Sequence, residues 1–231
     1  MNYEQARFNM IEQQIRPWEV LDNQILQLLA VIKREDFCPL AHRALAFVDM
    51  EIPLTNNLQQ HPSQCMLSPK VEARILQDLA VQKHEKVLEI GTGSGYMAAL
   101  LGHRGQHVVS IEIDPDLAQT ARDNLQKAGI YNADVRTGDG AAHFAKSVTG
   151  NDPLAGPFDV IVLSGSVASV SAELLALLKV GGRLSAIVGD EPVMRATLIT
   201  RVDDGAFRTV QAWDTVAPRL LHFAEPSKFT F

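Results

Sequence analysis

The chain has 231 residues, enough for one large α/β domain with a sizeable core or for such a domain with an appendage. Its 21 basic and 27 acidic residues give a net charge of −6, which disfavours nucleic acid as a partner, because that binding normally needs a basic face. Cys38 and Cys65 form neither a metal-ligand spacing nor a disulfide framework. The sequence shows no apolar signal core and no apolar run that could span a membrane, so we expect a cytoplasmic protein with no metal site and no membrane partner.

Two amphipathic helices are predicted at the start of the chain. Residues 3–16 place apolar side chains on one stripe, and Pro17 ends this helix. A second helix follows Asp22, its predicted N-cap, and its apolar residues recur at helical spacing as far as Ile32. Both helices need a surface on which to bury their apolar stripes.

A polar, irregular segment separates these helices from the rest of the chain. It covers residues 51–63, and a loop of this length in a compact domain is usually functional or disordered. Helical spacing then returns over residues 69–80. We therefore expect residues 1–68 to form a helical lid region that packs on the main domain of residues 69–231, so that the two make one compact unit.

From residue 86 onward, short apolar runs alternate with helical patterns. This alternation is typical of a parallel sheet with right-handed crossover connections. After Gly189 only extended segments follow, and the turn at residues 203–206 predicts an antiparallel hairpin at the sheet edge. The predicted fold is therefore α/β, with a doubly wound, mostly parallel seven-stranded sheet, an antiparallel C-terminal hairpin and an N-terminal helical extension. The predicted strands are residues 86–90, 107–113, 133–137, 158–163, 183–188, 194–202 and 207–213, and the helices between them are residues 96–102, 115–128 and 171–178.

The first of these strands leads into alternating glycines, Gly91, Gly93 and Gly95, and then into a helix. Glycine has no Cβ, so such a turn lets the backbone approach a ligand closely. A dinucleotide fingerprint would need a small residue where Tyr96 stands, and a phosphate-binding P-loop would need a following Gly-Lys-Ser/Thr. The spacing therefore favours S-adenosylmethionine over NAD, with the methionine carboxylate at the helix N-terminus.

Two acidic residues follow the next two strands. Glu112 comes about 20 residues after Gly91, where a carboxylate can accept hydrogen bonds from both ribose hydroxyls. Asp139 follows the third strand and is suited to the adenine amino group. Glu89 has two possible roles. It can contact the cofactor's amino group, or it can order the glycine turn. The predicted cofactor-binding residues are Glu89, Gly91, Thr92, Gly93, Ser94, Gly95, Glu112, Ile113, Gly138, Asp139 and Gly140.

Several segments along the chain carry a family resemblance. They are residues 10–16, 33–39, 87–96, 138–140, 158–162 and 181–184. With these motifs in this order, the chain resembles the protein-L-isoaspartate O-methyltransferase family over nearly its whole length. The resemblance implies a class I methyltransferase fold, S-adenosylmethionine as the methyl donor and S-adenosylhomocysteine as the product. It also implies that the acceptor is the carboxylate of an isoaspartyl residue in a damaged protein, and therefore a role in protein repair.

The acceptor side departs from the family pattern. Family members carry Gly-Gln-Thr-Ile-Ser-Gln-Pro before the first sheet strand, whereas residues 63–69 of this chain are Ser-Gln-Cys-Met-Leu-Ser-Pro. Leu67 therefore stands at the family's active-site serine, and Ser68 follows one residue later. After the fourth strand the family usually has Thr-Ala-Ala, and this chain has Ser164-Gly-Ser166. Ser68 and Ser164 are the predicted acceptor-orienting residues.

Leu67 leaves two alternatives open. In one, a methyltransferase of the same fold acts on another protein group or on a small molecule; in the other, the chain is a non-catalytic relative that binds the cofactor. Monomer and homodimer are both compatible with the sequence. Methyl transfer to a carboxylate needs no strong general base, because the acceptor is already anionic at neutral pH, so positioning does most of the chemistry.

Overall fold

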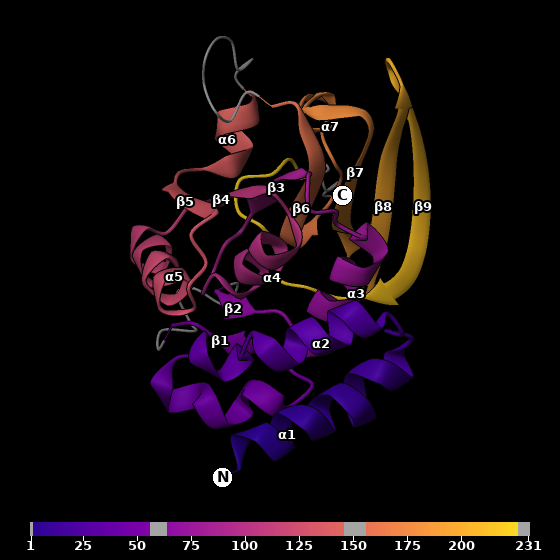
Figure 1. Ribbon diagram of the computed structural model, residues 1–231. Helices are drawn as coiled ribbons and strands as arrows, with labels where there is room; N and C mark the ends of the chain where they lie inside the picture. The colour runs from indigo at the N-terminus through magenta and orange to yellow at the C-terminus, as the bar shows by residue number, and fades with distance from the viewer. Residues whose placement is uncertain (1, 56–63, 146–155, 226–231) are drawn as a thin grey trace, which may run out of the picture.

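The computed structural model describes residues 2–55, 64–145 and 156–225. Its centre is a seven-stranded sheet with the order β5-β4-β3-β6-β7-β8-β9 (Figure 1). The strands β5, β4, β3, β6 and β7 are parallel to one another, whereas β8 pairs antiparallel with both β7 and β9. This arrangement confirms the predicted sheet and its antiparallel hairpin. The strands are β3 (Lys86–Ile90), β4 (His107–Glu112), β5 (Ala133–Thr137), β6 (Phe158–Val167), β7 (Leu178–Asp190), β8 (Val193–Asp203) and β9 (Ala206–Thr215).

Helices cover both faces of the sheet, as a doubly wound fold requires. Successive side chains of a strand point to opposite faces. Val87 and Val108 accordingly belong to a hydrophobic core shared with α3, α4, α5 and the N-terminal helices. Their neighbours Leu88 and Val109 belong to a second core, shared with α7. The helices of the main domain are α3 (Pro69–Leu79), α4 (Tyr96–Arg104), α5 (Pro115–Lys127), α6 (Gly140–Ala145) and α7 (Ala172–Ala176).

The N-terminal region is helical, but its first helix changes type along its length. α1 (Tyr3–Met10) continues as π-helical turns at Ile11–Ile15 and as a 3-10 turn at Arg16–Trp18. α2 (Asn23–Val31) begins after Asp22, whose side chain accepts an amide hydrogen of the first turn as predicted. Figure 1 shows both helices below the sheet, beneath the ends of α3 and α4.

Shorter elements connect this region to the sheet. Arg34–Asp36 and Leu40–Phe47 are 3-10 helices. β1 (Ile52–Pro53) and β2 (Cys65–Met66) pair antiparallel as a small sheet of their own. Residues 56–63 of the predicted irregular segment lie outside the part of the chain that the structure describes.

β6 and β7 are longer than the sequence pattern indicates. β6 does not end at residue 163, because the amide and carbonyl of Ser166 bond to Pro218 and Leu220 of the C-terminal segment. β7 begins at Leu178, five residues before the predicted start at 183, and its pairing with β6 contains register shifts. Both extensions depend on pairing with residues far away in the sequence, and a local sequence pattern cannot predict such pairing.

α6 was not indicated by the sequence pattern. Asp139 caps it, and its carboxylate accepts the amide hydrogens of Ala141 at 3.0 Å and Ala142 at 3.2 Å. A capping carboxylate satisfies amide groups that the first turn of a helix leaves without intrahelical partners. The helix thereby fixes the position of the Asp139 side chain.

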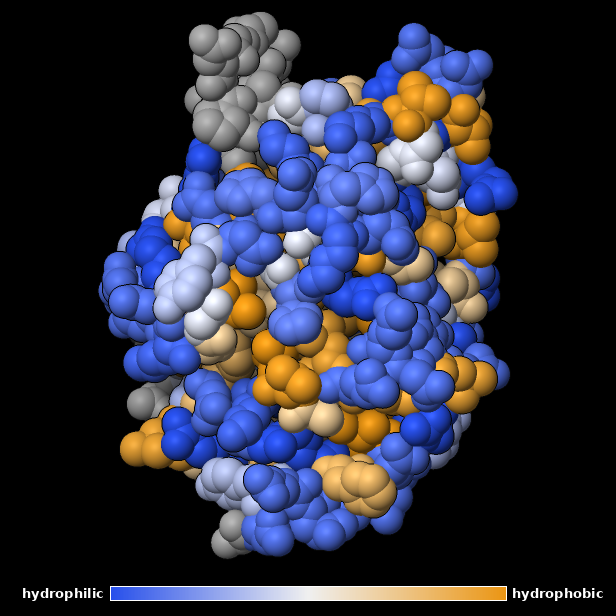
Figure 2. Space-filling model, viewed as in Figure 1, coloured by the Kyte–Doolittle hydropathy of each residue, from blue (hydrophilic) through white to orange (hydrophobic). Residues whose placement is uncertain are grey.

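The outer surface is mainly polar on the face shown in Figure 2. Hydrophilic residues cover most of it, and hydrophobic residues are exposed in small areas between them. None of the helices within the described residues is long and apolar enough to cross a membrane.

A buried ion pair joins the N-terminal region to α3. Arg34 is fully buried, and its guanidinium pairs with the carboxylate of Glu72 in α3. A second guanidinium nitrogen donates to the carbonyl oxygen of Leu67 at 2.7 Å. Arg7 and Glu35 form another buried pair beside it. Removing one partner of such a pair leaves a charge without compensation, so the pair holds α3 against the N-terminal region.

We expect Arg34→Ala to lower the free energy of unfolding by about 3–5 kcal/mol, because the Glu72 carboxylate would stay buried without its counter-charge. Urea denaturation followed by circular dichroism measures this. The matched control is Arg16→Ala, since the Arg16–Glu12 pair is partly exposed and lies within one helical turn; it should change the midpoint little. Equal, small effects of both substitutions would contradict the role given to Arg34.

Candidate active site

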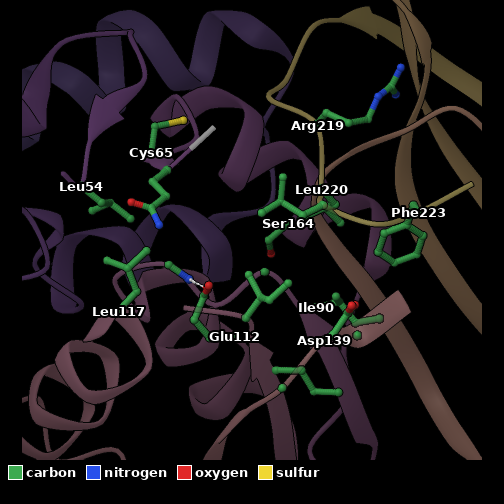
Figure 3. A pocket seen from close by; sticks show the side chains of 18 residues that line it. Leu54, Cys65, Ile90, Glu112, Leu117, Asp139, Ser164, Arg219, Leu220 and Phe223 are labelled. Atoms are coloured by element: carbon green, nitrogen blue, oxygen red, sulfur yellow. Dashed lines mark hydrogen bonds between the residues drawn. The ribbon is translucent and has the colours of Figure 1, made fainter. Parts of the chain in front are cut away.

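A cleft lies at the carboxyl ends of β3, β4 and β5 and beside β6 (Figure 3). Its empty volume, open mouth included, is ≈ 650 Å³, within the range of about 300–1,000 Å³ that small-molecule sites occupy. The predicted site residues that line it are Gly91, Gly93, Glu112, Ile113, Gly138, Asp139, Gly140 and Ser164. The structure therefore brings together residues at or just after the ends of three strands, β3, β4 and β5, and Ser164 within β6.

The glycine turn is tightly packed against its neighbours. Gly91, Gly93 and Gly95 have φ values of +92°, +55° and +87°, a region that other residues rarely adopt. A Cβ on Gly91 would lie 2.8 Å from Cδ2 of Leu220, and one on Gly95 would lie 3.2 Å from Cβ of Ala121 in α5. Gly91 and Gly93 thus form the cleft floor, whereas Gly95 lets α5 pack against the turn and does not line the cleft.

Glu112 connects the end of β4 to the glycine turn. One carboxylate oxygen accepts the amide hydrogen of Gly93 at 2.7 Å, and the other accepts that of Asp114 at 3.0 Å. Burial raises the pKa of Glu112 above its ordinary value, although the two amide hydrogen bonds act against this. Each carboxylate oxygen can accept more than one hydrogen bond, so the side chain can still receive two hydroxyl groups from the cleft.

Asp139 is held from two sides. One oxygen caps α6, and the other lies 2.6 Å from Nδ1 of His222 in the C-terminal segment. Burial by itself would raise the pKa of Asp139, but the hydrogen bonds from His222, Ala142 and Ala141 outweigh it and hold the pKa below its ordinary value. The side chain is therefore an ionised acceptor at neutral pH.

A second, smaller cavity lies behind the glycine turn, with an empty volume of ≈ 270 Å³. It shares Cys65, Gly91, Gly93 and Ser164 with the cleft, so Ser164 lies where the two meet. The other predicted residues Glu89, Thr92 and Ser94 line this cavity and not the cleft. Leu67, at the position of the family serine, also lines it.

Glu89 is fully buried and receives two hydroxyl groups. Ser110 donates to one carboxyl oxygen at 2.7 Å and Ser164 to the other at 2.8 Å. Burial raises the pKa of Glu89 to about 8, although these two hydrogen bonds act in the opposite direction. Of the two roles left open by the sequence, these contacts favour ordering of the site around the glycine turn.

The two predicted acceptor-orienting serines lie apart. Ser68 precedes α3 as its N-cap residue, and its side chain makes no capping hydrogen bond. It lines a different cavity, together with Trp18 and Asp49. Ser164 lies at the centre of the cleft in Figure 3, close to Leu220. The structure does not bring Ser68 together with Ser164.

The C-terminal segment forms one wall of the cleft and had no sequence signal. The amide of Ser166 donates to the Pro218 carbonyl at 2.8 Å, and the amide of Leu220 donates to the Ser166 carbonyl at 2.9 Å. These bonds bring apolar side chains over the glycine turn, next to the loop from β1. The lining residues not foreseen are Leu54, Gln64, Cys65, Ile90, Ile111, Leu117, Arg219, Leu220, Leu221 and Phe223.

The fold and the cleft together define a Rossmann-like protein of the class I methyltransferase type, with a glycine turn after the first parallel strand and acids after the next two. Comparison with known proteins identifies the family. The model of the family described as "Protein-L-isoaspartate(D-aspartate) O-methyltransferase (PCMT)" matches residues 5–216. The chain belongs to the protein-L-isoaspartate O-methyltransferase family.

Relatives at the sequence level cover most of the chain. Protein-L-isoaspartate O-methyltransferase 1 of Syntrophobacter fumaroxidans is 34% identical over 209 residues, 90% of this chain and 91% of that protein. The protein-L-isoaspartate O-methyltransferase of Methanoculleus marisnigri is 36% identical over 183 residues, 79% of this chain and 77% of that protein.

Solved structures confirm the fold. A Plasmodium falciparum protein described as a beta-aspartate methyltransferase, in complex with S-adenosyl-L-homocysteine, superimposes with a TM-score of 0.71 at 15% identity and covers 95% of this chain and 99% of that chain. Another protein-L-isoaspartate O-methyltransferase gives a TM-score of 0.72 at 23% identity, with 91% of this chain and 65% of that chain covered. The predicted class I methyltransferase fold is thus confirmed over nearly the whole chain.

Gly165→Ala tests how the C-terminal segment is held. A Cβ at this position would lie 2.8 Å from Cδ2 of Leu220 and 3.0 Å from the Pro218 carbonyl oxygen. Because the backbone would have to move, we expect faster hydrogen exchange of the Leu220 amide in this variant, measured by mass spectrometry or NMR. Gly138→Ala is the control, since nothing lies within 4 Å of its added Cβ. Unchanged exchange in Gly165→Ala would show that this contact does not hold the segment.

Proposed function

We propose that this chain is an S-adenosylmethionine-dependent O-methyltransferase that methylates the carboxylate of isoaspartyl residues in damaged proteins. The observation that carries the proposal is the convergence of the glycine turn, Glu112, Asp139 and Ser164 on one cleft. The names of the relatives and the S-adenosylhomocysteine in the Plasmodium falciparum structure support it.

The residues around the cleft fit each part of the donor. Glu112 has carboxylate oxygens available for the ribose hydroxyls, and Asp139 is an ionised acceptor for the adenine amino group. The N-terminus of α4, which has no side-chain cap and lies at the second cavity, is the place that suits the methionine carboxylate. When bound, S-adenosylmethionine supplies an electrophilic methyl group on its sulfonium sulfur. The protein's task is to hold that group in line with an acceptor oxygen at about 3 Å.

Ser164 is the residue best placed to orient the acceptor, because it lies where the cleft and the second cavity meet. Its hydroxyl can turn towards a carboxylate oxygen that does not receive the methyl group. The apolar side chains of Leu54, Leu220 and Phe223 line the same cleft and help to exclude water from the reacting atoms. The role predicted for Ser68 stays a prediction, and its place in another cavity gives it no support.

A second candidate function keeps the donor and changes the acceptor. Leu67 replaces the family serine and lines the second cavity, which makes this side of the site less polar than the family pattern implies. Such a site favours a carboxylate on another protein group or on a small, more apolar molecule. We infer a protein acceptor from the family. A cytoplasmic location and a monomeric or homodimeric state stay predictions from the sequence. A measurement of methyl-transfer turnover decides whether the chain is a non-catalytic relative.

Turnover of an isoaspartyl peptide tests the proposal. We expect release of S-adenosylhomocysteine with the isoaspartyl peptide and not with the same peptide that contains ordinary aspartate. Glu112→Gln should raise the KM for the donor at least about tenfold, because one charge-assisted hydrogen bond contributes about 1.5–3 kcal/mol. Glu173→Gln, at an exposed position in α7, is the matched control and should leave the donor KM unchanged. Donor binding without turnover of either peptide would favour another acceptor, and absence of donor binding would refute the proposal.

A further inference from the structure

Four polar side chains behind the glycine turn form one chain of hydrogen bonds. Thr92 Oγ1 lies 2.6 Å from Ser110 Oγ, Ser110 donates to Glu89 at 2.7 Å, and Ser164 donates to the other Glu89 oxygen at 2.8 Å. Thr92, Ser110 and Glu89 are buried, whereas Ser164 reaches the cleft. Among the described hydrogen-bond partners of Glu89, Ser164 is the one that lines the cleft as well as the second cavity.

The surroundings of Glu89 disfavour its charged form. No cation among the described residues is hydrogen-bonded to it or paired with it; its two hydrogen-bond partners are hydroxyl groups. The carboxylates of Glu72 and Glu112 raise the pKa of Glu89 further, in addition to the effect of burial. The titratable groups around it are Glu72 of α3, which is paired with Arg34, Glu112 of β4, Tyr96 of α4 and Cys65 of β2.

The protonation state of Glu89 decides where the Ser164 hydroxyl hydrogen points. A carboxylate can only accept hydrogen bonds, so an ionised Glu89 takes the hydrogen of Ser164 and leaves oxygen lone pairs facing the cleft. A neutral carboxylic acid carries a hydrogen that it can donate to Ser164 Oγ. The Ser164 hydrogen is then free to point into the cleft, towards an anionic acceptor. Hydrogen bonds to an ionised acceptor are about twice as strong as neutral ones, so a bound carboxylate favours this arrangement.

We propose that Glu89 is a positioning residue that acts as a neutral acid, donating to Ser164 so that the Ser164 hydroxyl binds the acceptor carboxylate. The inference rests on the carboxyl methyl transfer proposed above. No net proton transfer is required, because an anionic carboxylate and a cationic sulfonium give a neutral ester and a thioether. Ionisation of Glu89 turns the Ser164 hydroxyl hydrogen away from the cleft and towards Glu89. It also places a second negative charge near the acceptor carboxylate.

The predicted consequence is a loss of acceptor turnover as Glu89 ionises. With a pKa of about 8, the neutral fraction of Glu89 falls about tenfold between pH 7 and pH 9. We expect kcat/KM for an isoaspartyl peptide to fall about tenfold over the same interval, at saturating S-adenosylmethionine. Glu89→Gln carries an amide that donates to Ser164 at every pH, so its kcat/KM should change less than about twofold. Release of S-adenosylhomocysteine is the readout, because it does not depend on the lifetime of the ester.

Three further variants separate positioning from a merely structural role. Glu85→Gln alters another buried carboxylate, one that pairs with Arg183 and does not line either cavity, and it should retain the native fall in rate. Ser164→Ala should lower kcat/KM at pH 7, and adding Glu89→Gln to it should leave the pH profile unchanged, because the hydroxyl that Glu89 directs is absent. Calorimetry with S-adenosylhomocysteine confirms that each variant is folded.

Each outcome decides the inference. The inference is overturned if kcat/KM of the native protein does not change between pH 7 and pH 9. It is also overturned if the tenfold fall in kcat/KM persists in Glu89→Gln. If Glu89→Gln does not fold, the Ser164→Ala profile decides, and a native-like tenfold fall in that variant contradicts the role of the hydroxyl. Absence of isoaspartyl turnover at every pH, with S-adenosylhomocysteine still bound, refutes the proposed function itself and with it this inference.

Discussion

The hydrogen bond from the Gly93 amide to the Glu112 carboxylate fixes the geometry on which the site depends. It ties the glycine turn after β3 to the end of the neighbouring strand β4 at 2.7 Å. Because β3, β4, β5 and β6 are adjacent in the sheet, their carboxyl ends open on the same edge. Glu112, Asp139 and Ser164 then face one cleft although they lie far apart in the sequence. The Glu112 carboxylate therefore has a structural role in the free protein, and its oxygens can still accept hydrogen bonds from a ligand.

On the acceptor side, a buried ion pair fixes the position of the chain. Arg34 and Glu72 hold the start of α3 and the Leu67 carbonyl in a fully buried arrangement, so the segment that carries Leu67 has little freedom to shift. A shift by one residue would be needed to bring Ser68 to the family serine's place. The structure instead places a hydroxyl in the cleft from β6, through Ser164. Under the proposed function, donor recognition and acceptor recognition come from separate parts of the chain, and the departure from the family pattern at Leu67 lies on the acceptor side.

Features that depend on local spacing were predictable from the sequence. The alternation of strands and helices, the positive-φ glycines and the caps at Asp22 and Asp114 are properties of short segments, and the structure contains them at the expected places. The acids at the strand ends were predictable because parallel strands open on one edge. No such rule predicts the position of residues 216–223, because their contacts with Ser166 and Asp139 join residues 50 or more positions apart in the sequence. The same limit explains the missed extension of β6 and the separation of Ser68 from Ser164.

A crystal structure with bound S-adenosylhomocysteine tests the central claim most directly. We expect the ribose hydroxyls on the Glu112 carboxylate, the adenine amino group at Asp139 and the sulfur directed towards Ser164. The position of the sulfur is the decisive feature, because it marks where the methyl group would leave the donor. Adenosine bound outside the cleft, or a sulfur directed away from Ser164 and towards Ser68, would contradict the account.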